Sequence, residues 1–160
     1  MGTHFWIFIF FVCASAEECP VGFIEISGKC YLFSEHLGEN VRTQLEARLF
    51  CQVLGHEYSV DLATLGSEAT SATDPLMKYI YDNDMSDSGL WLGAERSGST
   101  FQWIDGRDLS TESFLWHYAA PSSHDCVAVA SSWNNNNVKR HYIADRTCSE
   151  LYHFVCEKFQ

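Results

Sequence analysis

Apolar side chains recur at a helical spacing in two stretches of the chain. Over residues 41–54 apolar positions repeat every four residues and Gly55 follows them, which predicts one amphipathic helix that ends at the glycine. A second helix is predicted from Asp74-Pro75, because an N-cap residue followed by proline at the first helical position is typical of a helix start. The apolar positions of the first helix are Val41, Leu45, Leu49 and Val53, with Ala47, Phe50 and Cys51 widening the stripe.

Short runs of β-branched and aromatic residues predict strands in the rest of the chain. Residues 23–33 form such a run with Ser27-Gly28 at its centre, which predicts a hairpin within residues 19–33. Asn134 to Asn137 are expected to form the tip of a later hairpin, because asparagine tolerates positive φ. Further strands are expected at residues 90–92, 101–103, 126–129, 138–143 and 153–157. Two helices followed by short antiparallel strands indicate the α+β class.

The acidic residues after the second predicted helix do not match a calcium loop of the EF-hand type. Such a loop needs glycine at its sixth position, and Asp87 stands there when the count begins at Asp82. We therefore expect Asp82, Asp84 and Asp87 to lie in an exposed loop.

The first 16 residues have the pattern of a signal peptide. A short apolar run from Phe5 to Val12 precedes Ala14-Ser15-Ala16, the small-x-small pattern after which signal peptidase cuts. The run is about half the length of a membrane-spanning helix, which needs about 20 apolar residues. We therefore expect a secreted protein without membrane insertion, whose single mature domain covers residues 17–160.

Six cysteines remain when Cys13 is removed with the signal peptide. An even number of cysteines in an oxidising compartment predicts three disulfides, although the sequence alone allows several pairings. A zinc site is not expected, because the chain has no closely spaced C-x-x-C pair. The six are Cys19, Cys30, Cys51, Cys126, Cys148 and Cys156.

Composition and charge exclude several classes of function. The 160 residues are 46% hydrophobic and 14% aromatic, which is typical of one folded domain and not of a disordered chain. A formal charge of −11 is unfavourable for binding nucleic acid or anionic membranes. The chain also has no Gly-x-Ser-x-Gly, no His-Glu-x-x-His and no phosphate loop, so an enzyme is not expected.

Five short motifs follow one another along the mature chain. They are Ala47-x-x-x-Cys51, Trp91-Leu92-Gly93-Ala94, Phe101-x-Trp103-x-Asp105-Gly106, Asp125-Cys126-Val127 and Phe154-Val155-Cys156-Glu157. In this order and with this cysteine spacing, they resemble the C-type lectin-like domain family across essentially the whole mature chain. The large rings on the predicted short strands are expected in the core, and Asp105-Gly106 is expected to form a turn.

The resemblance implies the long form of the family fold. That fold is α+β, with two helices, short antiparallel sheets, a long loop region and three disulfides. By resemblance we pair Cys19 with Cys30, Cys51 with Cys156, and Cys126 with Cys148. Because every mature cysteine has a partner in this pattern, a disulfide-linked dimer is not expected.

The resemblance also implies where a calcium and sugar site would lie. Sugar-binding members carry Glu-Pro-Asn or Gln-Pro-Asp around a cis-proline, and Trp-Asn-Asp before the next-to-last cysteine. This chain has Ala120-Pro121-Ser122 and Ile143-Ala144-Asp145 at those places, and His124 where the family has an acid. Calcium needs about six to eight oxygen ligands. We therefore expect no cofactor, with Asp125 and Asp145 as weak metal candidates.

Histidine and basic residues surround the same region. His117, His124 and His141 lie there with the two aspartates, but their separations match no metal-ligand spacing, so a transition-metal site is not expected. Strand alternation over residues 138–142 places Lys139 and His141 on one face, which makes a small patch beside the loop or a charged, exposed edge strand. The candidate ligand-binding residues are Pro121, Ser122, His124, Lys139, His141 and Asp145.

Two functions remain open at this point. The first is a secreted recognition module that binds a glycan or an extracellular protein without the family's calcium site, and the resemblance suggests innate defence or adhesion for it. The alternative is a calcium-dependent carbohydrate-binding lectin with an irregular site, formed by backbone carbonyls with Asp125 and Asp145.

Overall fold

A computed structural model describes most of the chain. It covers residues 18–38, 41–66, 73–85, 89–133, 136 and 138–159. The expected signal peptide, Asp87 and three of the four asparagines of the expected hairpin tip lie outside the described residues. None of the described helices has the length and apolarity that a bilayer span requires.

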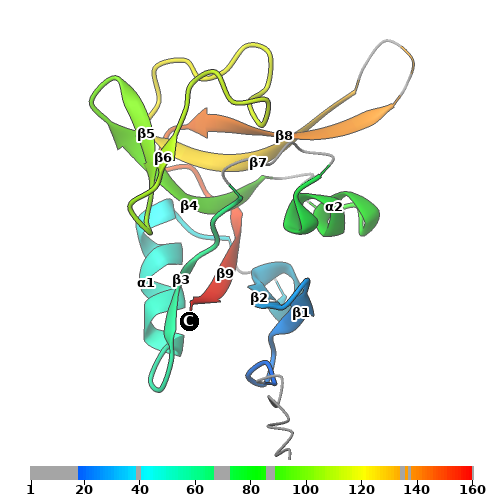
Figure 1. Ribbon diagram of the computed structural model, residues 1–160, viewed down its shortest axis with the longest axis vertical. Coiled ribbons are helices and arrows are strands. Elements are labelled where there is room, and N and C mark those ends of the chain that lie inside the picture. The colour runs from blue at the N-terminus through cyan, green and yellow to red at the C-terminus, as the bar shows by residue number, and fades with distance from the viewer. Residues whose placement is uncertain are drawn as a thin grey trace, which may run out of the picture.

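Two α-helices and nine strands occur in the described part of the chain (Figure 1). The helices are α1 (Gln44–Leu54) and α2 (Pro75–Asp82), with a 3₁₀ turn at Ser34–Leu37. The strands are β1 (Ile24–Ile26), β2 (Lys29–Phe33), β3 (Ser59–Leu62), β4 (Leu90–Ser97), β5 (Thr100–Trp103), β6 (Asp108–Leu109), β7 (Cys126–Trp133), β8 (Lys139–Arg146) and β9 (His153–Phe159). The predicted α+β class is confirmed.

The last strand, β9, lies at the centre of the sheet. Its later residues pair on both sides with antiparallel strands, so that Leu32 of β2 and Leu62 of β3 both stand opposite Cys156. Its first residues pair with β4 in parallel, Leu90 with His153 and the next residue of each strand likewise. The expectation of antiparallel sheets is wrong for this one pair, because β9 returns to the sheet in the same direction as β4.

Strand β4 connects the strands in the upper half of the molecule. It pairs with β5 on one side and with β7 on the other. Strands β7 and β8 form a long hairpin that is paired from Cys126–Arg146 to Trp133–Lys139. Figure 1 shows this hairpin at the end of the molecule away from the carboxyl terminus, with the long loop between β6 and β7 beside it. The loop is thus held on a rigid edge of the sheet.

Helix α1 presents a different face to the core from the one its pattern suggests. The positions of the four-residue repeat are between 41% and 68% exposed, whereas Ala47 and Cys51, which widened the predicted stripe, are buried together with Gln44. The disulfide from Cys51 to Cys156 fixes the face of the helix that meets β9, and the small Ala47 allows close packing. The predicted amphipathic helix is therefore present, but its core face is formed by the residues that widened the stripe and not by the four-residue repeat.

The ends of α1 also differ from the prediction. The helix begins at Gln44, since Thr43 and Glu46 form a reciprocal capping box in front of it. Gly55 follows the helix as expected, but its φ is −82°, so no left-handed cap forms. Glycine is required there because a Cβ atom would lie 2.5 Å from the carbonyl oxygen of Tyr58.

The other predicted elements are present. Helix α2 begins as expected, because the Asp74 carboxylate accepts hydrogen bonds from the amides of Leu76 and Met77. The hairpin of β1 and β2 turns at Ser27-Gly28, where both residues have positive φ. Strands β3 and β6 were not predicted, because each is short and carries an aspartate within it.

The core consists of two clusters on either side of the central strands. Trp91 and Phe101 are 0% exposed and Trp103 is 2% exposed, which confirms their expected core role. The turn at Asp105-Gly106 is also confirmed, since the amide of Trp103 bonds the carbonyl of Arg107 and Gly106 has a φ of 88°. The three expected disulfides are present, with Cα separations of 5.2 to 5.5 Å.

The long disulfide is expected to stabilise the fold more than the amino-terminal one. The bond between Cys51 and Cys156 closes a separation of 105 residues, and chain entropy assigns it about 4–5 kcal/mol. The bond between Cys19 and Cys30 closes only 11 residues and is expected to contribute about 3 kcal/mol. Urea unfolding of the two double alanine variants measures both free energies. An equal loss of stability in the two variants would contradict the expectation.

Trp103→Ala is expected to destabilise the protein by about 3–5 kcal/mol, because it removes a buried indole from the main core cluster. Trp133→Ala is the matched control, since that indole is 65% exposed and its loss should change stability little. Thermal unfolding measured for both variants checks the difference. Equal melting temperatures in the two variants would show that Trp103 does not serve as a core residue.

Candidate functional site

The loop between β6 and β7 is fastened to the edge of β8. The amide of Ile143 donates to the carbonyl of Leu115, and the amide of His117 donates to the carbonyl of Ile143. A few residues further on, the peptide bond between Ala120 and Pro121 is cis. The cis-proline of the resembled family is therefore retained, although its flanking acids and amides are not.

Asp145 on β8 binds the next part of this loop. Its carboxylate accepts the amide of Ser122 at 2.8 Å, the hydroxyl of Ser122 at 3.0 Å and the amide of His124 at 2.8 Å. The residue is 2% exposed. Burial raises the pKa of the carboxyl. The hydrogen bonds from Ser122 and His124 lower this pKa by more than burial raises it, so it lies below the usual range.

The low pKa of Asp145 determines how the loop depends on pH. A carboxylate whose pKa is depressed on folding stabilises the folded state at neutral pH. That stabilisation is lost only as the pH falls through the depressed pKa. The attachment of the loop to β8 is therefore complete under physiological conditions.

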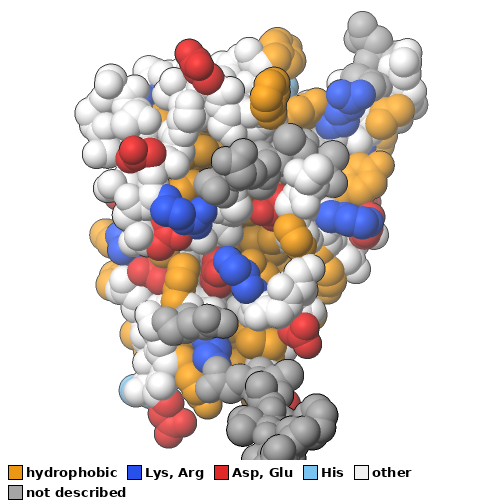
Figure 2. Space-filling view, in the orientation of Figure 1, with side chains coloured by type: hydrophobic (Ala, Val, Ile, Leu, Met, Phe, Trp, Pro, Cys, Tyr) orange, Lys and Arg blue, Asp and Glu red, His pale blue; other side chains and the backbone are white. Residues whose placement is uncertain are grey.

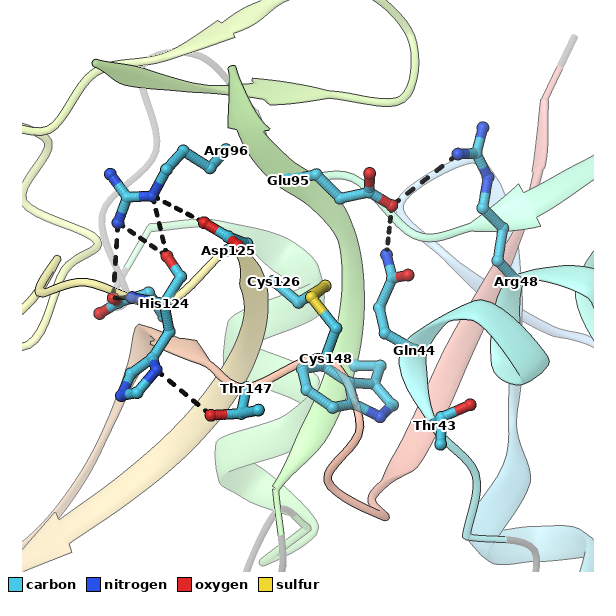
Figure 3. Close-up of a disulfide and its surroundings, with 12 residues drawn as sticks. Thr43, Gln44, Arg48, Glu95, Arg96, His124, Asp125, Cys126, Thr147 and Cys148 are labelled. Atoms are coloured by element: carbon cyan, nitrogen blue, oxygen red, sulfur yellow. Dashed lines mark hydrogen bonds and ion pairs between the residues drawn. A yellow bond between two sulfur atoms is a disulfide. The ribbon is translucent and has the colours of Figure 1, made fainter. Parts of the chain in front are cut away.

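Arg96, at the end of β4, reaches the same loop from the other side. Its guanidinium donates to the carbonyl of Ser122 at 3.2 Å, to the carbonyl of His124 at 2.7 Å and to the carboxylate of Asp125 at 3.1 Å. A guanidinium nitrogen also lies 3.7 Å from the carboxylate of Asp145. Figure 3 shows Arg96 pointing at His124 and Asp125, while the preceding Glu95 points to Gln44 and Arg48 of α1.

A cleft of about 390 Å³ opens between the loop and the β7–β8 hairpin. Residues with polar side chains make up much of its lining, among them two histidines, two serines and one arginine. The lining residues are His117, Ala119, Ala120, Ser122, His124, Ala130, Ser131, Ala144, Asp145 and Arg146. Three of the predicted ligand-binding residues, Ser122, His124 and Asp145, thus line one cleft, and Pro121 lies in the loop beside it.

The two candidates from the β8 strand lie elsewhere. Lys139 and His141 share a face, as strand alternation predicts, but that face packs toward α2. Lys139 pairs with Asp84, and His141 is 3% exposed, with its Nε2 atom 3.0 Å from the carbonyl of Met85. The interpretation of these two residues as a patch beside the loop is wrong, because hydrophobic and hydrogen-bonding contacts with the α2 region enclose the imidazole.

Several residues of the site were not predicted. Arg96 precedes its loop partners by 26 to 29 residues, so nothing in the local sequence indicates the contact. Arg146 directly follows Asp145, but no spacing pattern marked it. Tyr118 is 94% exposed and its ring lies 4.2 Å from that of His117, between centroids. Exposure of the ring is seen only in the folded structure, so no signal in the sequence indicated Tyr118.

The calcium ligands implied by the resemblance do not fit this geometry. The carboxylate of Asp145 is occupied by loop hydrogen bonds, and a guanidinium lies beside it. Ala120 and Ala144 offer no side-chain oxygen. Among the described residues, no group of three or more histidine, cysteine, aspartate or glutamate side chains is placed to hold a metal. The side chains of the family's calcium positions therefore do not supply the set of oxygen ligands that a calcium ion needs.

Charge on the surrounding surface is dispersed. On the face shown in Figure 2, lysine and arginine side chains lie apart from one another, and several have an acidic neighbour. Lys29, for example, pairs with Glu157 at 2.7 Å. Arg146, His117 and His124 line one cleft on this acidic protein.

Comparisons with known proteins agree with this architecture. The family model described as the lectin C-type domain matches residues 41–158. A C-type lectin of Micrurus corallinus is 28% identical over 94% of this chain and 89% of that protein. Asialoglycoprotein receptor 2 of Mus musculus is 25% identical over 93% of this chain, which spans 45% of the receptor.

A solved structure gives the same result for the fold. The C-type lectin domain of murine dendritic cell inhibitory receptor 2, in complex with N-glycan, superposes with a TM-score of 0.66 at 19% identity. The match covers 88% of this chain and 98% of that domain. Because the family model covers well over half of the sequence and the fold agrees, the chain belongs to the C-type lectin domain family.

Proposed function

We propose that the protein is a secreted recognition module that binds a glycan in the cleft beside Ala120 and Pro121, without calcium. The cleft itself carries the proposal. Its volume of about 390 Å³ lies within the range of small-ligand pockets, about 300–1,000 Å³. A protein partner would instead need a broad surface of about 800 Å² on each side, so a sugar is the better fit.

The chemistry of the cleft suits sugar hydroxyls. The imidazole of His117 lines the cleft, and its Nδ1 atom accepts the amide of Ala119 at 3.4 Å. Ser131 adds a hydroxyl and Arg146 a guanidinium to the same lining. Hydroxyl groups both donate and accept hydrogen bonds, so a wall of mixed donors and acceptors is a suitable environment for them.

An aromatic ledge stands beside the cleft. Tyr118 is exposed, and its ring contacts His117 at a tilt of 41°. His117 in turn meets Tyr142 edge to face, with centroids 5.4 Å apart. A sugar ring has an apolar face of C–H groups, and an exposed ring supported by its neighbours offers a flat apolar surface at small entropic cost. The ledge and the polar cleft together match the two kinds of surface that a sugar ring presents.

Known relatives support a glycan as the ligand. The similar murine domain was solved in complex with N-glycan, and a relative from Notechis scutatus scutatus, 26% identical, is named a mannose-binding isoform. The family is one of binding modules, which agrees with the absence of catalytic motifs from the sequence. Secretion follows from the expected signal peptide, and a role in defence or adhesion is what the family resemblance suggests.

Calcium is expected to leave the stability of the protein unchanged. A site with a Kd near about 0.1 mM would add about 2 kcal/mol at several millimolar calcium, which is several degrees in melting temperature. Melting curves in EDTA and in about 5 mM calcium should therefore agree. A calcium-induced rise that Asp145→Asn abolishes would support the alternative, a calcium-dependent lectin with irregular ligands.

Glycan binding is expected to survive EDTA and to weaken about tenfold in Tyr118→Ala, because the variant removes the exposed ring of the ledge. A glycan array with and without EDTA, followed by titration of the bound glycans, measures both effects. Phe114→Ala is the matched control, since Phe114 is 85% exposed on the same loop, whereas the Tyr118 ring contacts His117, which lines the cleft.

Either of two results would contradict the glycan proposal. One is an array without any bound glycan under either condition. The other is equal affinity of Tyr118→Ala and Phe114→Ala for a glycan that the unaltered protein binds, with both variants melting normally.

A further inference from the structure

We propose that the Arg96 guanidinium is the resident cation of this site, positioned in an oxygen-lined cage where it holds residues 122–125 in their bound shape. The cage combines backbone carbonyls of Ser122 and His124 with the carboxylates of Asp125 and Asp145. Carbonyl and carboxylate oxygens converging on one point are the surroundings that a cation requires. In this chain the positive charge comes from a side chain of β4.

The contacts are too numerous for a simple surface ion pair. A single exposed pair contributes little to stability, and the carboxylate of Asp125 is 69% exposed. The decisive contacts are those to the carbonyls of Ser122 and His124, because their oxygens belong to the loop backbone itself. Only a planar fork of several N–H groups bonds two carbonyls and a carboxylate at once, and arginine has that shape.

Two further contacts fix the position of Arg96. Its guanidinium lies over the ring of Phe101, 4.5 Å from the centroid, and Phe101 is fully buried. The backbone amide of Arg96 donates to the carbonyl of Asp125 at 2.7 Å. The side chain is 23% exposed, so it is largely withdrawn from water. A donor fixed in this way organises the loop at small further cost.

The cage also connects the cation to the wall of the cleft. The same two residues whose carbonyls meet Arg96 donate their amides to Asp145. Ser122 and His124 are therefore held between β4 and β8, with Arg96 on one side and Asp145 on the other. Both residues line the cleft. Arg96 is thus a positioning residue that shapes the cleft without lining it.

Hydrogen exchange tests the proposal directly, in the absence of any glycan and in EDTA. In Arg96→Gln we expect the amides of peptide 117–125 to exchange at least about tenfold faster, because the loop has lost its cation. Peptide 153–159, from the central strand, should exchange as in the unaltered protein. Arg140→Gln is the matched control, since Arg140 is an exposed arginine on β8 outside the cage.

Arg96→Lys separates the charge from the fork. It keeps a cation but cannot bond all the oxygens, so it should recover part of the protection that Arg96→Gln loses. A lysine variant that exchanges as fast as the glutamine variant would show that charge does not hold the loop and would overturn the proposal. If the glutamine variant is not secreted in folded form, faster exchange confined to 117–125 in the lysine variant supports the proposal and unchanged exchange overturns it.

Two further results would overturn the proposal. One is a folded Arg96→Gln protein with unchanged exchange over 117–125. The other is calcium-induced protection of these amides in the unaltered protein, since that would make a metal ion the organising cation. Because the measurement needs no ligand, failure here is distinct from failure of the proposed glycan binding.

Discussion

The bond between Cys51 and Cys156 is the constraint on which the arrangement of the other elements depends. It joins α1 to β9 across a separation of 105 residues, at the point where β9 is paired with β2 and β3 on its two sides. Because β9 then continues its pairing to β4, the same strand links the terminal hairpin to the upper sheet. The platform that supports the long loop is therefore fixed from the carboxyl-terminal end of the chain.

The loop is held by polar contacts, whereas the platform is held by packing. Its backbone is bonded at Ile143, at Asp145 and at Arg96, and each of these residues belongs to a strand of the upper sheet. A buried carboxylate is costly without partners, and Asp145 has three hydrogen bonds within one short loop segment. The acidic residue that the family resemblance assigns to metal binding is here a structural anchor for the loop.

Sequence patterns predicted the fold well where the signal was local or carried by the cysteines. The Asp74-Pro75 helix start, the Ser27-Gly28 turn and the three disulfides needed only short motifs or the family resemblance. The buried face of α1 was predicted only in part: Ala47 and Cys51 are buried, but the bond at Cys51 turns Leu45 and Leu49 toward solvent. Hydrophobic periodicity carries no information about such a bond.

The site was harder to predict than the fold. Ser122, His124 and Asp145 were found because they occupy motif positions close in sequence to cysteines. Arg96 and Tyr118 were missed, since one acts across the sheet and the other is defined by its exposure. His141 was wrongly included, because alternation tells which residues share a face but not what covers that face. A contact across the sheet, the exposure of a ring and the covering of a face all depend on tertiary structure.

The attachment of Arg96 to the chain has a thermodynamic consequence. A site organised by a dissolved ion is formed only in the fraction of molecules that mass action allows, so its occupancy changes with dilution and from one compartment to another. A guanidinium on β4 is present once in every molecule, and its local concentration is set by the geometry of the strand. If Arg96 organises the loop as we propose, the loop of this lectin domain keeps the same shape in a calcium-poor fluid as in a calcium-rich one.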